Sequence, residues 1–264
     1  MNPVEVAQGD SPVILGLPHP GTFLPDDIFA ALTPRGQVLA DTDWHIHRLY
    51  GGLLPGATTV RATFHRYVID ANRGPDDASL YPGQNTTGLV PLTDFDGAPI
   101  WKSEPGAEDI ATRKARFHAP YHAALAAEIE RVRARHGVAI LYDCHSIRSV
   151  IPFLFDGVLP DFNIGTNSGA SCAPAIEAAT QEVASATGRT WVVNGRFKGG
   201  WTTRHYGQPG AGVHAIQMEL AQSTHLTSET PPFAYDEAKA AALRVPLRDI
   251  LTRLAALAPQ LVTP

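Results

Sequence analysis

The sequence is poor in several features that define particular classes of protein. Its 264 residues include only two cysteines, Cys144 and Cys172, which cannot form a disulfide framework and favour a reducing compartment. Residues 1–12 contain neither a basic start nor an apolar segment, so we expect no secretory signal and predict a cytoplasmic protein. No apolar run approaches the roughly 18 residues that a membrane span requires.

Charged residues are also sparse, at 18% of the chain, and the formal net charge is -5. This balance offers no basic surface for nucleic acid or for an anionic membrane, so we expect neither as a partner. The chain lacks a Gly-x-Ser-x-Gly elbow, which disfavours an α/β serine hydrolase. It also lacks the glycine-rich motifs of dinucleotide and P-loop sites, so no motif supports nucleotide binding.

What the sequence does contain is a 44% hydrophobic fraction, arranged in short runs that can build a sizeable core. Runs typical of buried strands cover residues 13–17, 58–64 (an extension to 69 stays open), 138–142, 191–193 and 213–220. Helical spacing of apolar residues predicts helices over 108–136, broken or kinked at Pro120, and over 236–257. We also expect helices over 171–187 and 42–54. Alternating strands and helices predict an α/β fold, and the lack of repeats or linkers predicts one domain over residues 1–264.

A long segment between these elements, residues 74–104, is dense in Pro, Gly, Asp and Thr and shows little periodicity. Structureless segments of this length in compact domains are often functional lids. We therefore interpret this segment as a candidate functional lid.

Polar residues stand where the apolar runs end. His19 follows the first run within a Pro-His-Pro-Gly turn, Asp143 and His145 follow the third, and Glu219 lies near the end of the last. Ligands and catalytic groups of open α/β sheets gather at the carboxyl ends of strands. Two histidines and one carboxylate would suffice for a hydrolytic zinc site, and a further carboxylate could serve as base and proton donor.

Each of these residues also has a structural interpretation. His19 could cap its turn, and His145 could be a core histidine paired with Asp143. A lone acid inside an apolar strand is costly to bury without a partner, so Glu219 is the hardest to explain structurally. Asp43 could be a first-turn acid in a helix capped by Asp41 or Thr42 just as well as a ligand.

Two further residue types have competing interpretations. Arg73 could hold a substrate carboxylate in a two-point fork or form a structural ion pair. Cys144 could be a thiolate nucleophile, but alternation along a strand turns it away from His145 and favours a packing role. The remaining histidines singled out, which we expect at the surface, are His45, His47, His65, His136 and His225.

A series of short motifs runs in order along the chain: 17–21 (LPHPG), 41–44 (DTDW), 66–73 (RYVIDANR), 80–83 (LYPG), 143–148 (DCHSIR), 163–166 (NIGT), 195–200 (GRFKGG), 203–207 (TRHYG) and 214–219 (HAIQME). In these motifs the chain resembles the N-formylglutamate amidohydrolases (deformylases) of histidine degradation over about residues 11–226. The resemblance implies hydrolysis of N-formyl-L-glutamate to formate and L-glutamate. It extends distantly to zinc carboxypeptidases and aspartoacylase-like deacylases. That implies a phosphorylase/hydrolase-like fold, with a mixed, mostly parallel sheet flanked by helices, and one divalent metal ion.

The same resemblance implies roles at the metal site. His19 and His145 would be the two histidine ligands of the metal, with Zn²⁺ expected and iron, cobalt or manganese as alternatives. Zinc carboxypeptidases take a carboxylate ligand from a His-x-x-Glu motif, which here has Thr22 in the fourth place. We therefore favour Asp43 as the third ligand. Asp143 is the alternative ligand, although we prefer it as a partner that orients a ring.

Further roles concern the substrate and the reaction. Glu219 would deprotonate the attacking water and then protonate the leaving amine. Asn72 and Arg73 resemble the Asn-Arg pair that holds the substrate carboxylate in carboxypeptidases. We assign the second substrate carboxylate to Arg148 or Lys198, and oxyanion stabilisation to Arg204 or His205. Arg196 adds to the positive charge available for a dianionic small molecule.

Three other hypotheses remain at this point. The same scaffold could act on another N-acyl amino acid or a small peptide. A metal-independent thiol amidase would use Cys144, and a non-catalytic binding protein would lack the ligands or the base, all of which are present. The sequence gives no indication of oligomeric state or strand order.

Overall fold

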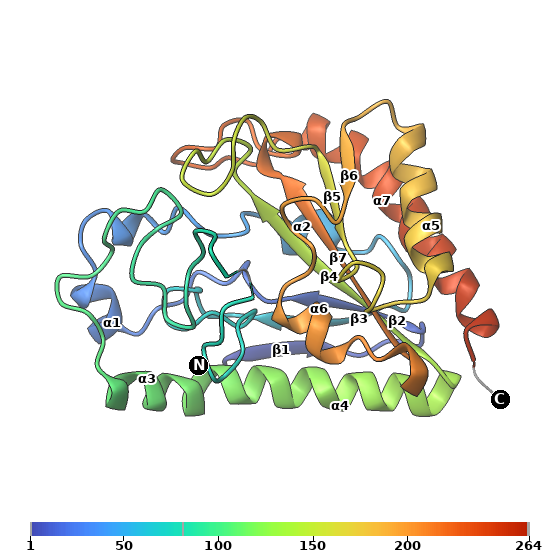
Figure 1. The fold of residues 1–264 in the computed structure, drawn as a ribbon, viewed down its shortest axis with the longest axis horizontal. Coiled ribbons are helices and arrows are strands. Elements are labelled where there is room, and N and C mark those ends of the chain that lie inside the picture. The colour runs from blue at the N-terminus through green and yellow to red at the C-terminus, as the bar shows by residue number, and fades with distance from the viewer. Residues whose placement is uncertain (1, 81, 263–264) are drawn as a thin grey trace.

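The computed structural model describes residues 2–80 and 82–262. Within these residues seven strands form one sheet in the order β1-β3-β2-β4-β7-β5-β6 (Figure 1). The strands are β1 (Val4–Ala7), β2 (Val13–Leu17), β3 (Thr58–Ala62), β4 (Ala139–Ile147), β5 (Phe162–Gly165), β6 (Trp191–Val193) and β7 (Val213–Ala221). Only β1–β3 and β5–β7 pair antiparallel among the described strands. The predicted mixed, mostly parallel sheet is confirmed.

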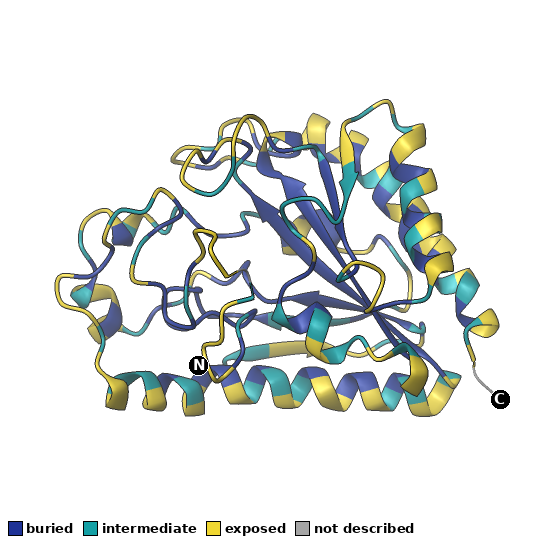
Figure 2. Cartoon of the chain, in the orientation of Figure 1, coloured by how far each residue is buried: buried dark blue, intermediate teal, exposed yellow. Residues whose placement is uncertain are grey.

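Helices cover both faces of this sheet. The helices are α1 (Asp26–Ala31), α2 (Ile46–Tyr50), α3 (Ala107–Arg113), α4 (Ala119–His136), α5 (Pro174–Ala186), α6 (Trp201–Tyr206) and α7 (Glu237–Leu257). The buried side of α4 packs with β2, β3 and β4 in one core, and α2, α5 and α7 pack on the other face. Figure 2 shows the central strands buried, the edge strands β1 and β6 partly exposed, and the outer sides of the helices exposed. No described helix is both long and apolar enough to cross a bilayer.

Alternation along β4 and β7 separates packing residues from site residues. Cys144 packs into the core under α5 and α7, as the alternation predicts. Asp143 and His145 lie on the opposite face, in line with residues that pack against α4. The parallel register sets Glu219 beside His145 and Gln217 beside Asp143. Two strands thus bring polar side chains together at their carboxyl ends.

The strand predictions were accurate for the runs but incomplete. The strand β4 extends to Ile147, so its polar residues belong to the strand itself. The open extension of the second run is not a strand, because β3 ends at Ala62. Sequence reasoning missed β1 and β5, which are four residues each: β1 is a largely exposed edge strand, and β5 contains Asn163 and Gly165. Neither shows a long apolar run.

The predicted helix over 42–54 is confined to α2. His45 precedes it in a left-handed conformation with φ of 60°, so Asp41 and Thr42 do not cap it and Asp43 lies outside its first turn. Asp41 instead accepts hydrogen bonds from the Tyr67 hydroxyl and the Phe95 backbone. This local geometry sends the Asp43 side chain toward β4.

Two histidines expected at the surface are buried. His65 and His225 are fully shielded from solvent, and both lie in connections that the fold covers. His65 Nδ1 accepts a hydrogen bond from the Tyr67 amide, and His225 Nε2 lies 3.0 Å from the carbonyl oxygen of Trp44. A polar residue type alone therefore did not predict exposure here.

The segment predicted as one long helix over 108–136 contains a wide turn. A π-helical turn at Lys114–His118 joins α3 to α4, and Pro120 lies in the first turn of α4. Proline has no amide hydrogen to continue the α-helical pattern, and the wider turn accommodates this loss. The chain nevertheless continues as one rod, at the bottom of Figure 1.

Candidate active site

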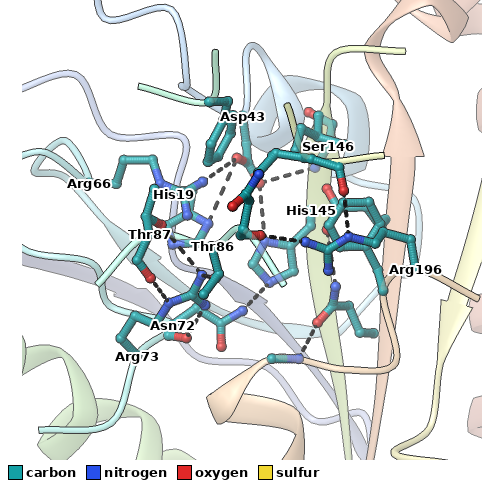
Figure 3. Close-up of a pocket in the computed structure, with 18 residues that line it drawn as sticks. His19, Asp43, Arg66, Asn72, Arg73, Thr86, Thr87, His145, Ser146 and Arg196 are labelled. Carbon is teal, nitrogen blue, oxygen red and sulfur yellow. Dashed lines mark hydrogen bonds and ion pairs between the residues drawn. The ribbon is translucent and has the colours of Figure 1, made fainter. Parts of the chain in front are cut away.

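A cavity of about 590 Å³, including its open mouth, lies at the carboxyl ends of β2, β4 and β7 (Figure 3). Its described lining consists of His19, Asp43, Arg66, Asn72, Arg73, Asn85, Thr86, Thr87, Phe95, His145, Ser146, Ile147, Leu154, Arg196, Phe197, Gly200, Gln217 and Glu219. Asn85, Thr86, Thr87 and Phe95 come from the 74–104 segment, which has no helix or strand among its described residues. This segment therefore contributes four side chains to the cavity lining.

His19, Asp43 and His145 form a buried cluster whose potential ligand atoms lie within 4.8 Å of one another. Asp43 Oδ2 is 3.2 Å from His145 Nδ1, and Asp43 Oδ1 is 3.8 Å from His19 Nδ1. Two ligands of a tetrahedral ion, each about 2.1 Å from it, lie about 3.4 Å apart. His19 Nδ1 is buried without a hydrogen-bond partner, so the cluster fits a divalent cation.

A carboxylate lies beside the opposite nitrogen of each ring. His19 Nε2 is hydrogen-bonded to Asp70 Oδ1 at 2.7 Å, which fixes the His19 tautomer and turns Nδ1 toward the cluster. His145 Nε2 lies at ion-pair distance, 3.1 Å, from Asp143 Oδ1. Asp143 therefore lies behind the His145 ring while Asp43 lies in front of it, which supports Asp43 as the carboxylate ligand.

Burial and charge shift the pKa values of these groups in different directions. Burial, together with Arg66, lowers the pKa of His19. Burial opposes protonation of His145 as well, but the carboxylates of Asp143 and Asp43 outweigh it and raise its pKa well above the usual value. A cation at the cluster would take the place of this ring proton.

Glu219 lines the cavity from β7 and is only 6% exposed. Its Oε2 accepts a hydrogen bond of 3.0 Å from Gln217, whose own oxygen accepts from the Gly200 amide at 2.7 Å. Burial raises the pKa of Glu219 to about 8. A carboxylate poised near neutrality can take up and release a proton during turnover.

Asn72 and Arg73, the predicted carboxylate-binding pair, both line the cavity but at different depths. Asn72 lies deep, with Nδ2 3.0 Å from His145 Nε2 and Oδ1 accepting from the Thr202 amide at 2.8 Å. Arg73 lines the cavity, and its guanidinium donates to Thr87 O at 2.8 Å and to Thr86 Oγ1 at 2.9 Å. Arg73 thus faces the space where a ligand would lie.

The two cations assigned to a second substrate carboxylate do not line the described cavity. Arg148 donates to Asp96 at 2.9 Å, and Lys198 is exposed. Arg196, in the same 195–200 motif, does line it, with Nη2 donating to Asn85 O at 2.8 Å. The turn around this motif therefore places Arg196 inward and Lys198 outward.

The two residues predicted to stabilise the oxyanion also lie outside the described lining. Arg204 donates from Nε to Gly199 O at 2.8 Å, and the exposed His205 ring stacks on Trp201 at 4.1 Å. Both project from the short helix α6, which carries them away from the cavity. Arg66 instead adjoins the cluster of His19, Asp43 and His145, with its guanidinium 3.8 Å from the Asp43 carboxylate.

Sequence reasoning missed Arg66 and Asp70. Arg66 Nη2 donates to Asp70 Oδ2 at 2.6 Å, and both are buried behind His19. Their spacing of four residues is a signal for an ion pair, but the segment that holds them is not a helix. The short motif around them was therefore a better guide than any periodicity.

Known proteins resemble this chain both in sequence and in fold. N-formylglutamate deformylases of Pseudomonas aeruginosa and Pseudomonas putida are 49% and 47% identical over 253 residues, with 94% of each chain covered. The crystal structure of N-formylglutamate amidohydrolase from Ralstonia eutropha JMP134 superposes with a TM-score of 0.84 at 25% identity, covering 98% of this chain and 99% of that one. Residues 11–226 match the N-formylglutamate amidohydrolase family. The chain therefore belongs to the N-formylglutamate amidohydrolase family.

Proposed function

We propose that the chain hydrolyses N-formyl-L-glutamate to formate and L-glutamate, as a metal-dependent step of histidine degradation. Family membership supports the reaction. The observation that carries the mechanism is the convergence of His19 Nδ1, His145 Nδ1 and an Asp43 oxygen beside Glu219. This arrangement provides three ligands and a separate acid–base group.

His19, Asp43 and His145 would hold the ion, with Zn²⁺ expected for a set of two nitrogens and one oxygen. A divalent ion bound there would lower the pKa of a water molecule and polarise the formyl carbonyl. Asp70 and Asp143 would keep both rings oriented.

Glu219 would move the protons of the reaction. It would take a proton from the attacking water, whose oxygen forms a bond to the formyl carbon. It would return that proton to the glutamate nitrogen as the C–N bond breaks, which releases formate and the free amine. We assign stabilisation of the developing negative oxygen to Arg66, because Arg66 lines the described cavity beside Asp43 whereas Arg204 and His205 do not line it.

Arg73 and Arg196 would hold the two carboxylates of the substrate. Both guanidinium groups line the same cavity, one anchored through Thr86 and Thr87 and the other through Leu154 and Asn85. Planar guanidinium groups suit two-point contacts with carboxylates. Arg196 replaces Arg148 and Lys198 in this role, and the expected partner remains a small dicarboxylate.

Metal analysis combined with formate release tests this function. We expect about one bound ion per chain, formate release from N-formyl-L-glutamate, loss of activity with a chelator and recovery with Zn²⁺. N-acetylaspartate and C-terminal dipeptides, substrates of the alternative deacylase or peptidase function, should turn over far more slowly. Chelator-insensitive activity that disappears in Cys144→Ser would instead support the thiol mechanism.

A further inference from the structure

The turn that presents Asn72 and Arg73 belongs to a buried connection without regular structure. Residues 62–72 are all buried, yet beyond β3 they form neither a helix nor a strand. Buried backbone carbonyls need hydrogen-bond donors, and here no regular ladder supplies them. Turn and bridge amides supply donors to Thr63 O, His65 O and Asp70 O, and side chains supply donors to other carbonyls of this connection.

Three side chains of the α3–α4 rod supply these donors. Arg113 Nη1 lies 3.2 Å from Val68 O, His118 Nε2 2.9 Å from Arg73 O, and His122 Nε2 2.9 Å from Ala71 O. Residues five apart on an α-helix point about 140° away from each other. In the π-helical turn at Lys114–His118 the hydrogen bonds span five residues instead of four, so each turn holds more residues. Arg113 and His118 therefore face the same connection.

The rings of His118 and His122 act as neutral donors. A carbonyl oxygen only accepts, so each Nε2 must carry the hydrogen. His122 Nδ1 lies 3.1 Å from the Tyr206 hydroxyl on α6, which also lies 3.3 Å from His122 O. Burial lowers the pKa of His122 to about 3 and also lowers that of His118, consistent with neutral rings at pH 7.

The two held carbonyls bracket Asn72. From the other side α6 holds the same turn, through the Thr202 amide on Asn72 Oδ1 at 2.8 Å. Trp201 packs against Gly74, where an added Cβ would lie 2.8 Å from the indole nitrogen. The indole also contacts His122, with ring centroids 4.8 Å apart. Two helices therefore clamp one turn.

We propose that His118 and His122 are positioning residues that set Arg73 for the substrate carboxylate. Neither lines the described cavity, so each acts through the backbone it holds. The inference rests on the proposed carboxylate-binding role of Arg73. Since a displacement of about 1 Å can cost a reaction up to a hundredfold, loss of one donor should be visible in the kinetics.

The experiment compares leucine and glutamine replacements at both histidines. In the metal-loaded enzyme, His118→Leu and His122→Leu should raise KM for N-formyl-L-glutamate about tenfold, with kcat changed less than threefold and metal content unchanged. His118→Gln and His122→Gln keep an amide donor and should stay within about threefold of the parent KM. Leu251→Ala, on α7 across the sheet, controls for lost stability because it lowers Tm without reaching the turn.

Arg73→Ala distinguishes the carboxylate-binding role of Arg73 from the positioning role of the two histidines. If it raises KM while both leucine variants only lower Tm, as Leu251→Ala does, this inference is wrong and the role of Arg73 stands. If Arg73→Ala leaves KM unchanged, the role of Arg73 fails and the inference fails with it. Glutamine variants that fold normally but keep the raised KM would also overturn the donor argument.

Discussion

Individual side chains at this site divide their atoms between support and chemistry. Asp43 presents oxygens to both histidines and also accepts from the Ser146 amide at 3.0 Å. His19 and His145 each give one nitrogen to a supporting carboxylate. We therefore expect substitution of a proposed metal ligand and substitution of a neighbouring supporting residue to have different effects on metal binding and turnover.

Replacement of Glu219 by glutamine removes the proposed proton carrier but none of the three proposed ligands. We expect kcat to fall by about two to four orders of magnitude, the usual contribution of general acid–base catalysis, with metal content unchanged. Formate release and metal analysis measure the two quantities on one sample. Glu130→Gln, an exposed acid on α4, serves as the control, and near-normal turnover of Glu219→Gln would refute the assignment.

Asp43 and Asp143 should respond differently to substitution. Asp43→Ala removes a proposed ligand and should leave the purified protein without bound metal. Asp143→Asn removes the charge behind His145 and should weaken metal affinity by about 10- to 100-fold without abolishing binding. Competition with a chelator of known affinity gives both values, and the reverse ranking would make Asp143 the ligand.

At the scale of elements, connections between strands and helices carry buried polar contacts. His225 follows β7 and lies 3.0 Å from the Trp44 carbonyl, just before α2. The contact joins the end of a central strand to the segment that carries Asp43. The stability of this connection therefore depends on the protonation state of the His225 ring.

Acidification should therefore weaken the fold through His225. Burial lowers its pKa to about 4, whereas the unfolded chain has the ordinary value near 6.5. The unfolded state binds more protons between these values, so stability is fully present above about pH 6.5 and falls as the pH drops toward 4, by on the order of 3 kcal/mol. Urea unfolding from pH 7 to 4.5 measures this loss, and His225→Asn should flatten it. Parallel profiles for parent and variant would contradict the prediction.

Across the whole molecule, the proposed ligands come from three separate parts of the chain. His19 follows β2, Asp43 precedes α2 and His145 belongs to β4. An ion bound to all three would join segments on both sides of the long 74–104 segment. Its free energy of binding would then contribute to global stability.

Removal of the ion should lower the melting temperature. At a metal concentration about 100 times its dissociation constant, binding would add about 2.7 kcal/mol, or several degrees for a chain of this size. Calorimetry with and without chelator tests this, with re-addition of Zn²⁺ as the control. An unchanged Tm after verified metal removal would show that the ion does not couple these segments.

The strands and candidate site residues that the sequence predicted share one property, a polar residue at the end of an apolar run. His19, His145 and Glu219 belong to this group, and Cys144 was placed by the same alternation. Arg196 and Asp70 lie in irregular connections, where side-chain direction depends on turns that no periodicity describes. Motifs located both neighbourhoods, but only the fold separates inward Arg196 from outward Lys198.

The register of β4 against β7 has a consequence for engineering. Backbone pairing fixes His145 beside Glu219, and a slip of one residue would turn a strand's site residues toward the other face. Directed evolution of new acyl or amine specificity should therefore leave both strands untouched. Variation belongs in the loops that carry Asn85, Leu154 and Arg196, which meet at the mouth of the cavity and can change shape without shifting the sheet.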